Sequence, residues 1–444
     1  MIRRKGLITR ASLLAVAATT AGAGNAYAQT APAPAASAPV IQTTPITPNA
    51  IANTRFLFSG YIKLDAIETK ADDGDFGDGG ATGRDFYLPS ATPVAALPGT
   101  GTNVPLSESA KLTMHAKQSR FIFGTDTDLA DKSTVSSRLE VDLYGSTVGN
   151  QRATNTYGVQ LRQAYLQYKG WLVGQAWTNF QDTGVLPETA DYIGPTDGTV
   201  FVRQAQVRYT VGGFSISAEN PETTITAPNG TQISSDDGAL PDITAAYQFK
   251  FGGTGSYIRA AALVRQLKYD TPNATNGIKN EATSISASTT GEALSVSGKF
   301  VIGSNDDIRF MATIGEGMGR YLGLNFANDA VLTATTNNLT TGVNADLKAI
   351  SGWAAFAAWR HAWTPQVRST FMYALGSYSN KTQYTNANLI NKKSDSIAAN
   401  LFYSPIPKVD VGVELRVAKR TVENATTTAD GTMKRLQASV KYSF

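Results

Sequence analysis

The sequence has no cysteine, only two histidines (His115 and His361) and few charges for its length of 444 residues. Without cysteine, no disulfide framework can stabilise the fold. Charged residues make up 17% of the chain, against roughly 25% in soluble proteins. After the N-terminal segment no window holds 18 apolar residues, so no helix is expected to span a bilayer.

The first 28 residues have the three parts of a secretory signal peptide. Four bases (Arg3, Arg4, Lys5 and Arg10) precede a short apolar run over 11–18, and Ala26-Tyr27-Ala28 resembles a cleavage site. The alternative, an N-terminal anchor helix, needs a longer apolar run. Removal of residues 1–28 leaves 35 basic and 35 acidic residues. A neutral mature chain gives nucleic acid no compositional support as a partner.

Residues 29–54 are rich in Pro, Ala and Thr, which is typical of an extended or disordered linker. The remainder, 55–444, contains 17 of the 18 Tyr, all 18 Phe and most of the 40 Gly. An exported chain without apolar helices can cross a membrane only as a closed barrel. The composition therefore favours a transmembrane β-barrel over 55–444.

The alternation of polar and apolar residues predicts sixteen strands. The expected strands are 55–69, 116–129, 133–145, 157–169, 171–180, 200–210, 213–220, 241–251, 255–270, 292–303, 307–321, 346–362, 366–380, 392–404, 408–421 and 432–444. The connections alternate between short turns rich in Gly, Pro, Asn or Asp and long polar loops. Short periplasmic turns and long external loops are typical of an outer-membrane barrel, and not of a soluble sandwich.

The final strand, LQASVKYSF (436–444), shows the two faces clearly. Leu436, Ala438 and Val440 alternate with polar residues. Because sixteen strands enclose a lumen too wide for side chains to fill, we expect the apolar set to face lipid and the polar set to face water. An even strand number closes the sheet, so the last strand is expected to pair with the first and to end at Phe444.

Several stretches resemble the DcaP-like family of trimeric outer-membrane porins. They are GYIKLDAI (60–67), FYLPSATPV (86–94), HAKQSRFIFGTDT (115–127), LRQAYLQY (161–168), GWLVGQAWTNFQD (170–182) and LPETADYIGPTDGTVFVRQAQVRY (186–209). The resemblance implies a homotrimer of sixteen-stranded barrels that takes up small, often anionic, solutes such as dicarboxylates. It also implies that Phe444 is read by the barrel-assembly machinery. The coiled-coil extension of better-known members is not supported, since 29–54 has no heptads.

Arginine recurs on the expected strands, where a lipid-facing arginine near mid-membrane would cost roughly 2–4 kcal/mol. We therefore expect most of these side chains to line the pore. The candidates are Arg120, Arg138, Arg162, Arg208, Arg259, Arg265, Arg309, Arg368, Arg416 and Arg435. Arg203 and Arg208 have opposite parity, and the pattern favours Arg208 as the inward residue.

The third long loop, 181–199, carries the acidic candidates Asp182, Glu188 and Asp191, with Asp197 beyond them. In porins of this size one loop folds into the lumen. Carboxylates facing an arginine wall across a narrow aqueous gap would create a transverse field, and a basic wall favours anions. In the alternative interpretation the arginines only fill the lumen, paired with carboxylates such as Glu140, Asp142, Glu219 and Glu414.

Four further interpretations concern an ion site, an enzyme, a plugged transporter and a structural barrel. The acidic stretch 72–80 lacks EF-hand spacing, because twelve positions from Asp73 the chain has Arg84. It is expected to be solvated, or bridged by divalent ions to lipopolysaccharide phosphates. An outer-membrane enzyme would use a histidine near the outer rim, and His115 is expected there because it opens the second strand. His361 is expected at the opposite end, so the two cannot cooperate, and no Gly-x-Ser-x-Gly motif occurs. A plugged transporter needs a larger N-terminal domain than 29–54. A non-conducting structural barrel stays open. We expect no cofactor, no metal and no covalent catalysis.

Overall fold

The structure is a computed structural model that describes residues 40–42, 53–76, 82–94, 109–145, 154–228, 230–252, 255–271, 274–275, 278–279, 285–334, 345–380, 389–424 and 427–444. The predicted signal peptide (1–28) lies outside the described residues, and only 40–42 and 53–54 of the predicted linker are described. Residues 39–444 form one compact unit. Among the described residues no helix is long and apolar enough to cross a membrane.

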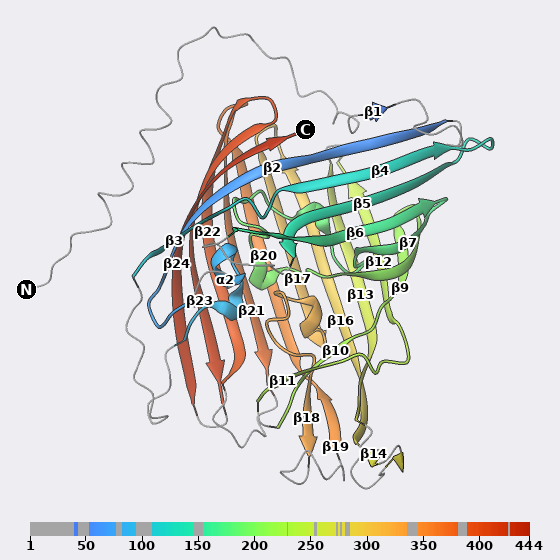
Figure 1. The fold of residues 1–444 in the computed structure, drawn as a ribbon, viewed down its shortest axis with the longest axis vertical. Coiled ribbons are helices and arrows are strands. Elements are labelled where there is room, and N and C mark those ends of the chain that lie inside the picture. The colour runs from blue at the N-terminus through green and yellow to red at the C-terminus, as the bar shows by residue number, and fades with distance from the viewer. Residues whose placement is uncertain are drawn as a thin grey trace, which may run out of the picture. The chain divides into compact units, whose positions relative to one another are not determined.

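The described residues form a closed antiparallel barrel of sixteen strands, as predicted (Figure 1). In chain order the barrel strands are β2 (Thr54–Ala71), β4 (Arg120–Asp128), β5 (Thr134–Gly145), β6 (Gly158–Tyr168), β7 (Trp171–Trp177), β8 (Arg203–Val211), β9 (Phe214–Glu219), β12 (Asp242–Phe251), β13 (Ser256–Thr271), β16 (Ile285–Ile302), β17 (Asp306–Glu316), β20 (Ser351–Ala362), β21 (Val367–Ser379), β22 (Ile390–Ile406), β23 (Val409–Glu423) and β24 (Thr428–Ser443). Each pairs with its neighbours in sequence order.

Smaller elements lie in the connections. They are β1 (Val40–Gln42), α2 (Thr82–Asp85), η2 (Pro89–Ala91), β3 (Lys111–His115), η3 (Thr183–Val185), η4 (Thr196–Gly198), β10 (Thr223–Thr226), β11 (Gln232–Ser235), β14 (Ala274–Thr275), β15 (Ile278–Lys279), η5 (Gly319–Tyr321), β18 (Ala330–Ala334) and β19 (Ala345–Ala349). β1 pairs with β2, and β10, β11, β18 and β19 form a second, four-stranded sheet. Two long loops, 221–240 and 322–345, are thereby joined through β10 and β18.

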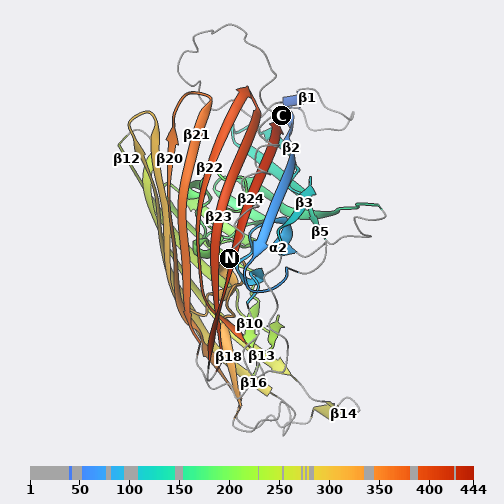
Figure 2. The same ribbon diagram turned by 90° about the vertical axis from the view of Figure 1, so that its left-hand side faces the viewer.

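The barrel closes where β24 pairs with β2 (Figure 2), from Tyr61 opposite Ser443 to Ala71 opposite Met433. The amide of Phe444 donates to the carbonyl of Gly60 at 3.0 Å, and the amide of Gly60 donates back at 3.2 Å. The Phe444 ring packs against Phe58, with centroids 5.2 Å apart. The predicted pairing of the last strand with the first is confirmed.

Besides shifts at strand ends, three predicted strands differ from those observed because other segments interrupt or shorten them. The second is interrupted, since β3 and β4 share one place beside β2 and 116–119 separate them. The predicted strand 307–321 ends at Glu316, and the chain then turns through η5. The predicted strand 346–362 is split, because β19 belongs to the four-stranded sheet and only β20 to the barrel. In each case a loop folded into the barrel takes the residues that alternation alone assigned to the wall.

Side chains alternate between the two faces of the wall as the pattern predicts. On β23, Val413 and Leu415 are 44% and 59% exposed on the outside, whereas Glu414 and Arg416 between them are buried inside. The inner face is not wholly polar, however. Leu263, Met311 and Phe356 point inward and are buried in one apolar cluster with loop residues. The expectation that the inner set faces water is therefore wrong for this part of the wall.

Candidate functional site

The loop after β7 lines the interior as a belt, which we define as residues 181–193. Its contacts follow the circumference of the wall in order. Asp182 bonds to Tyr257 on β13 and Ser297 on β16, and the carbonyl of Leu186 accepts from Arg309 on β17. Glu188 accepts a hydrogen bond from β21. The amide of Ala190 donates to β23, and its carbonyl accepts from β24. Tyr192 finally donates to Asp142 on β5.

The belt carboxylates contact the wall directly. Both oxygens of Glu188 accept from Arg368, at 2.6 and 2.7 Å. Asp182 accepts from the hydroxyls of Tyr257 (3.0 Å) and Ser297 (2.7 Å), not from arginine. Asp191 accepts from the amide of Tyr87 at 2.9 Å and lies 3.9 Å from Arg435. The expected aqueous gap between loop and arginine wall is therefore wrong at Glu188.

After the belt, the segment around η4 forms hydrogen bonds with the loop that carries α2 and η2. The buried Asp197 accepts from the Tyr87 hydroxyl at 2.7 Å and from Ser396 at 2.5 Å. The Arg416 guanidinium stacks on the Tyr87 ring, 4.7 Å from its centroid. Burial raises the pKa of the Asp197 carboxyl and that of the Tyr87 hydroxyl. Two loops far apart in sequence thus share one dry contact inside the barrel.

Five of the ten predicted arginines are buried in such contacts. They are Arg162, Arg259, Arg265, Arg416 and Arg435. Arg162 bridges Glu140 (2.5 Å) and Asp142 (2.7 Å). Arg416 pairs with Glu414 at 2.8 Å. Arg259 and Arg435 donate instead to backbone carbonyls, those of Gln181 and Gly83 among them. These groups hold loops to the wall rather than offering charge to water.

Arg265 is the clearest example, since its side chain has no exposed surface. It lies 3.2 Å from Asp242 on β12 and donates to Asp329, in the loop before β18, at 2.9 Å. Asp329 also accepts from the amides of Thr224 (2.8 Å) and Arg320 (2.9 Å). The ion pair therefore anchors two long loops to the wall at one point.

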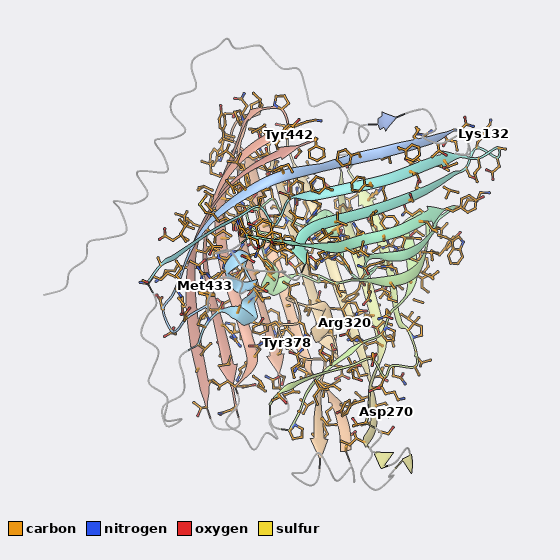
Figure 3. All side chains as sticks on the ribbon, in the orientation of Figure 1. Lys132, Asp270, Arg320, Tyr378, Met433 and Tyr442 are labelled. Atoms are coloured by element: carbon orange, nitrogen blue, oxygen red, sulfur yellow. The ribbon has the colours of Figure 1, made fainter. Side chains whose placement is uncertain are left out.

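A different set of basic groups gathers near the short turns. We call Lys299, Arg309, Arg360, Arg368 and Lys441 the basic ring. The exposed fraction of the side chain ranges from 14% for Arg368 to 31% for Lys441 among the four members that form ion pairs. The carboxylates among them are Asp307, Glu188 and Asp410. Figure 3 marks the same end of the barrel by Tyr442, with Asp270 at the opposite end.

The remaining predicted arginines lie on the other side of the interior. Arg138 pairs with Asp126 at 2.9 Å, and Arg120 with Glu140 at 3.2 Å. Arg208 shares its face with Gln204 and Gln206, which contact inner groups. Arg203, of opposite parity, is the first residue of β8 and stacks on Trp177.

The two histidines do not form an accessible catalytic site. His115 ends β3 inside the barrel, 2% exposed, with its Nε2 3.0 Å from the carbonyl of Asp85. It does not stand at the outer rim, as the predicted strand boundary had implied. His361 lies beside the turn after β20, with Nδ1 2.8 Å from Asp306. A buried imidazole cannot reach a substrate in the bilayer or the medium.

The acidic stretch after β2 is only partly described. Asp72 pairs with Lys434 at 3.0 Å and Asp75 with Lys111 at 2.8 Å. In the described part of the chain no three His, Cys, Asp or Glu side chains group as metal ligands would.

Sequence reasoning missed Lys299 and Arg360 in the basic ring, and Asp329 in the loop anchor. Lys299 and Arg360 could have been found, since each is on the inward parity of its strand, opposite Arg309 and Asp307. The part of the wall whose inner face is apolar could also have been found from the sequence. The run SGWAAFAAWRHA (351–362) is apolar on both faces, which is typical of a strand buried on both sides. No sequence pattern pointed to Asp329.

Comparison with known proteins agrees with this architecture. The family described as DcaP outer membrane protein matches residues 90–444. The crystal structure of the outer membrane channel DcaP of Acinetobacter baumannii has a TM-score of 0.64 at 22% identity, covering 88% of this chain and 98% of that one. OmpT of Vibrio cholerae has a TM-score of 0.49 at 13% identity, over 89% and 99% of the two chains. The comparison with curated proteins gives no match.

Proposed function

The chain belongs to the DcaP outer membrane protein family, and we propose that it is an outer-membrane porin through which small hydrophilic solutes diffuse, with a preference for anions such as dicarboxylates. The fold supports a passive channel, because a closed barrel with a charged inner face offers solutes a route across the bilayer. The buried His115 gives no support to the enzyme alternative.

The basic ring is the observation that carries the anion preference. It places five basic side chains beside three carboxylates on neighbouring strands. Lys299 lies opposite Arg309 and has neither a hydrogen bond nor an ion pair among the described residues. Asp307 is shared between Arg309 (2.6 Å) and Arg360 (3.7 Å). An excess of positive charge in a narrow aqueous space raises the local concentration of anions.

The setting of the channel completes the proposal. Residues 1–28 direct export and are removed, and residues 29–54 precede the barrel in the periplasm. Three barrels assemble as a homotrimer, and Phe444 serves as the signal for assembly. The aromatic contacts of Phe444 with Phe58 and Phe121 support a position in the aromatic girdle at the periplasmic rim.

The proposal is tested by the reversal potential of the purified porin in planar bilayers under a KCl gradient. The wild type is expected to favour chloride. The triple variant K299Q/R309Q/R360Q should move the reversal potential toward cation preference, because it removes the charge excess. A matched control is Lys434→Gln, which neutralises a lysine on the outer face that pairs with Asp72.

Cation preference in the wild type would overturn the proposed selectivity. An unchanged reversal potential in the triple variant would show that the basic ring does not set it. The absence of solute uptake in liposome swelling would favour the non-conducting structural barrel.

A further inference from the structure

A cavity of about 330 Å³ opens on the inner wall away from the basic ring. It lies on β5 to β8, at the end of the barrel where the short turns connect the strands. Its lining includes Thr134, Ser136, Gln167, Lys169, Arg208 and Thr210. The volume is at the lower end of small-molecule sites, which span roughly 300–1,000 Å³. The cavity therefore admits one small solute.

The register of the strands places the key residues in one row. Ser136 lies opposite Gln167, Gln167 opposite Leu172, and Leu172 opposite Arg208. Residues opposite each other in antiparallel strands share a face, with Cβ atoms about 4.5–5.5 Å apart. Two hydroxyl residues, Thr134 and Thr210, lie two positions along β5 and β8 toward the short turns, on the same face.

The guanidinium of Arg208 is available to a solute. Within the described residues it makes no hydrogen bond and no ion pair. The carboxylate nearest to it in the register of β8 and β9 is Glu219, which lies opposite Gln206. The oxygens of Glu219 already accept from the amide of Asn179 at 2.8 Å, from Gln204 and from Ser217 at 2.6 Å. Arginine presents a planar fork of donors that matches a carboxylate, so a solute anion can take the unused place.

The remaining lining indicates what else the solute carries. Thr134, Ser136 and Thr210 offer hydroxyls, and Gln167 offers an amide, which can each donate and accept. Such groups complement the hydroxyls of a solute. A second carboxylate would gain little, because Lys169, the other cation of the lining, is bonded to Asp131 at 2.7 Å.

We propose that the row of Ser136, Gln167, Leu172 and Arg208 is a binding site for hydroxylated monocarboxylates, the class of the sugar acids. The site lies at the end of the channel where the short turns connect the strands. The inference rests on the proposed porin function and assigns this site a substrate class of its own, beside the dicarboxylates that the basic ring attracts. It differs from simple anion attraction by the basic ring, which does not distinguish one small anion from another. A solute held here pauses at the mouth before it leaves or enters the narrower part of the interior.

The test is the block of the single-channel chloride current by gluconate, succinate and propionate, each titrated from the side of the short turns. Gluconate should block the wild type at the lowest concentration. Arg208→Gln should weaken the block by gluconate about tenfold or more, the usual effect of losing a charged hydrogen bond. Arg309→Gln, in the basic ring, should leave the gluconate block unchanged while it shifts the reversal potential in KCl.

A second variant, T134V/S136A, removes hydroxyls and keeps Arg208. It should weaken the block by gluconate and leave the block by propionate as it is. The proposal is overturned if succinate blocks the wild type better than gluconate, or if Arg208→Gln leaves the gluconate block intact. Anion preference in KCl is scored separately. Its absence in the wild type would defeat the proposed selectivity, whereas a retained gluconate block would still support this site.

Discussion

Two levels of the barrel interior use arginine in opposite ways. Farther from the short turns, Arg265 and Arg416 are buried and bonded to carboxylates. Near the short turns, Arg309 and Arg360 are 17% and 29% exposed and share Asp307, and Arg360 also lies 3.6 Å from Glu188. All four point inward from barrel strands. The difference comes from the loops, which cover Arg265 and Arg416 and leave Arg309 and Arg360 partly exposed. We call the first position the dry level and the second the wet level.

An inward-facing cation can therefore have one of two roles, in the stability of the fold or in the electric field of the pore. A buried cation needs a partner, since removing a charge from water costs several kcal/mol unless it is paired and hydrogen-bonded. A cation at the wet level needs none and contributes mainly to the field in the aqueous space. Burial and pairing, not parity, therefore decide whether an arginine supports the fold or the passage of solutes.

Replacement of Arg265 should have the largest effect. Arg265→Met leaves Asp242 and Asp329 buried without their cation, and breaking a buried pair costs about 3–5 kcal/mol. We expect a lower melting temperature of the folded barrel and faster proteolysis in the loops that Asp329 anchors. Thermal unfolding in detergent and limited trypsin digestion measure the two.

The matched control is Arg309→Met at the wet level. Its partly exposed ion pair is worth about 0–1 kcal/mol. Equal destabilisation by the two substitutions would break the distinction between the levels.

Neutralising one carboxylate at each level should affect selectivity at only one of them. Glu188→Gln removes one of the two carboxylates beside Arg368 and beside Arg360, which keep Asp410 and Asp307, so the preference for anions should rise. Two charges 4 Å apart interact by about 1 kcal/mol in water, which limits the change in permeability ratio to about fivefold. Reversal potentials in a KCl gradient give the ratio.

Glu414→Gln is the counterpart at the dry level, where Glu414 pairs with the buried Arg416. It should lower stability and leave the permeability ratio near the wild-type value. A larger shift in selectivity from Glu414→Gln than from Glu188→Gln would contradict the comparison.

The smallest expected effect concerns pH. Burial raises the pKa of Asp197 above the ordinary aspartate value of 3.8, so the folded state holds this proton more tightly than the unfolded chain does. The stability from Asp197 is therefore fully present below that value and is lost as the pH rises through the raised pKa. In Asp197→Asn this part of the pH dependence should disappear. Melting temperatures of both proteins from pH 3 upward, in steps of about one unit, compare the curves, and parallel curves would count against the assignment.

The barrel was predictable from the sequence because its determinants are local. Alternation and turn residues are visible in runs such as 408–421, and the parity of Arg208 against Arg203 followed from counting along one strand. The inner face was less predictable. Whether Arg265 meets water depends on Asp329, which lies 64 residues away in a loop. No periodicity links the two, since their contact depends on how that loop folds back.

The belt shows the same limit. Its carboxylates Asp182, Glu188 and Asp191 were identified by composition, and its entry into the barrel by resemblance. Its course along the wall depends on contacts with strands from β13 round to β5, made by single side chains or backbone groups. The order of these contacts follows the order of the strands, which is information that a loop sequence does not contain by itself.

The seam between β2 and β24 has a consequence for how the barrel forms. The two strands stand at opposite ends of the sheet in sequence, so their pairing has the greatest loop-closure cost of any neighbours in the wall. Until it forms, both strands are open edges that can pair with other chains. Closure of this seam therefore removes both open edges in one step. A chain that has not placed its final strand has two unpaired sheet edges, and the mutual hydrogen bonds between Gly60 and Phe444 form only when this seam closes.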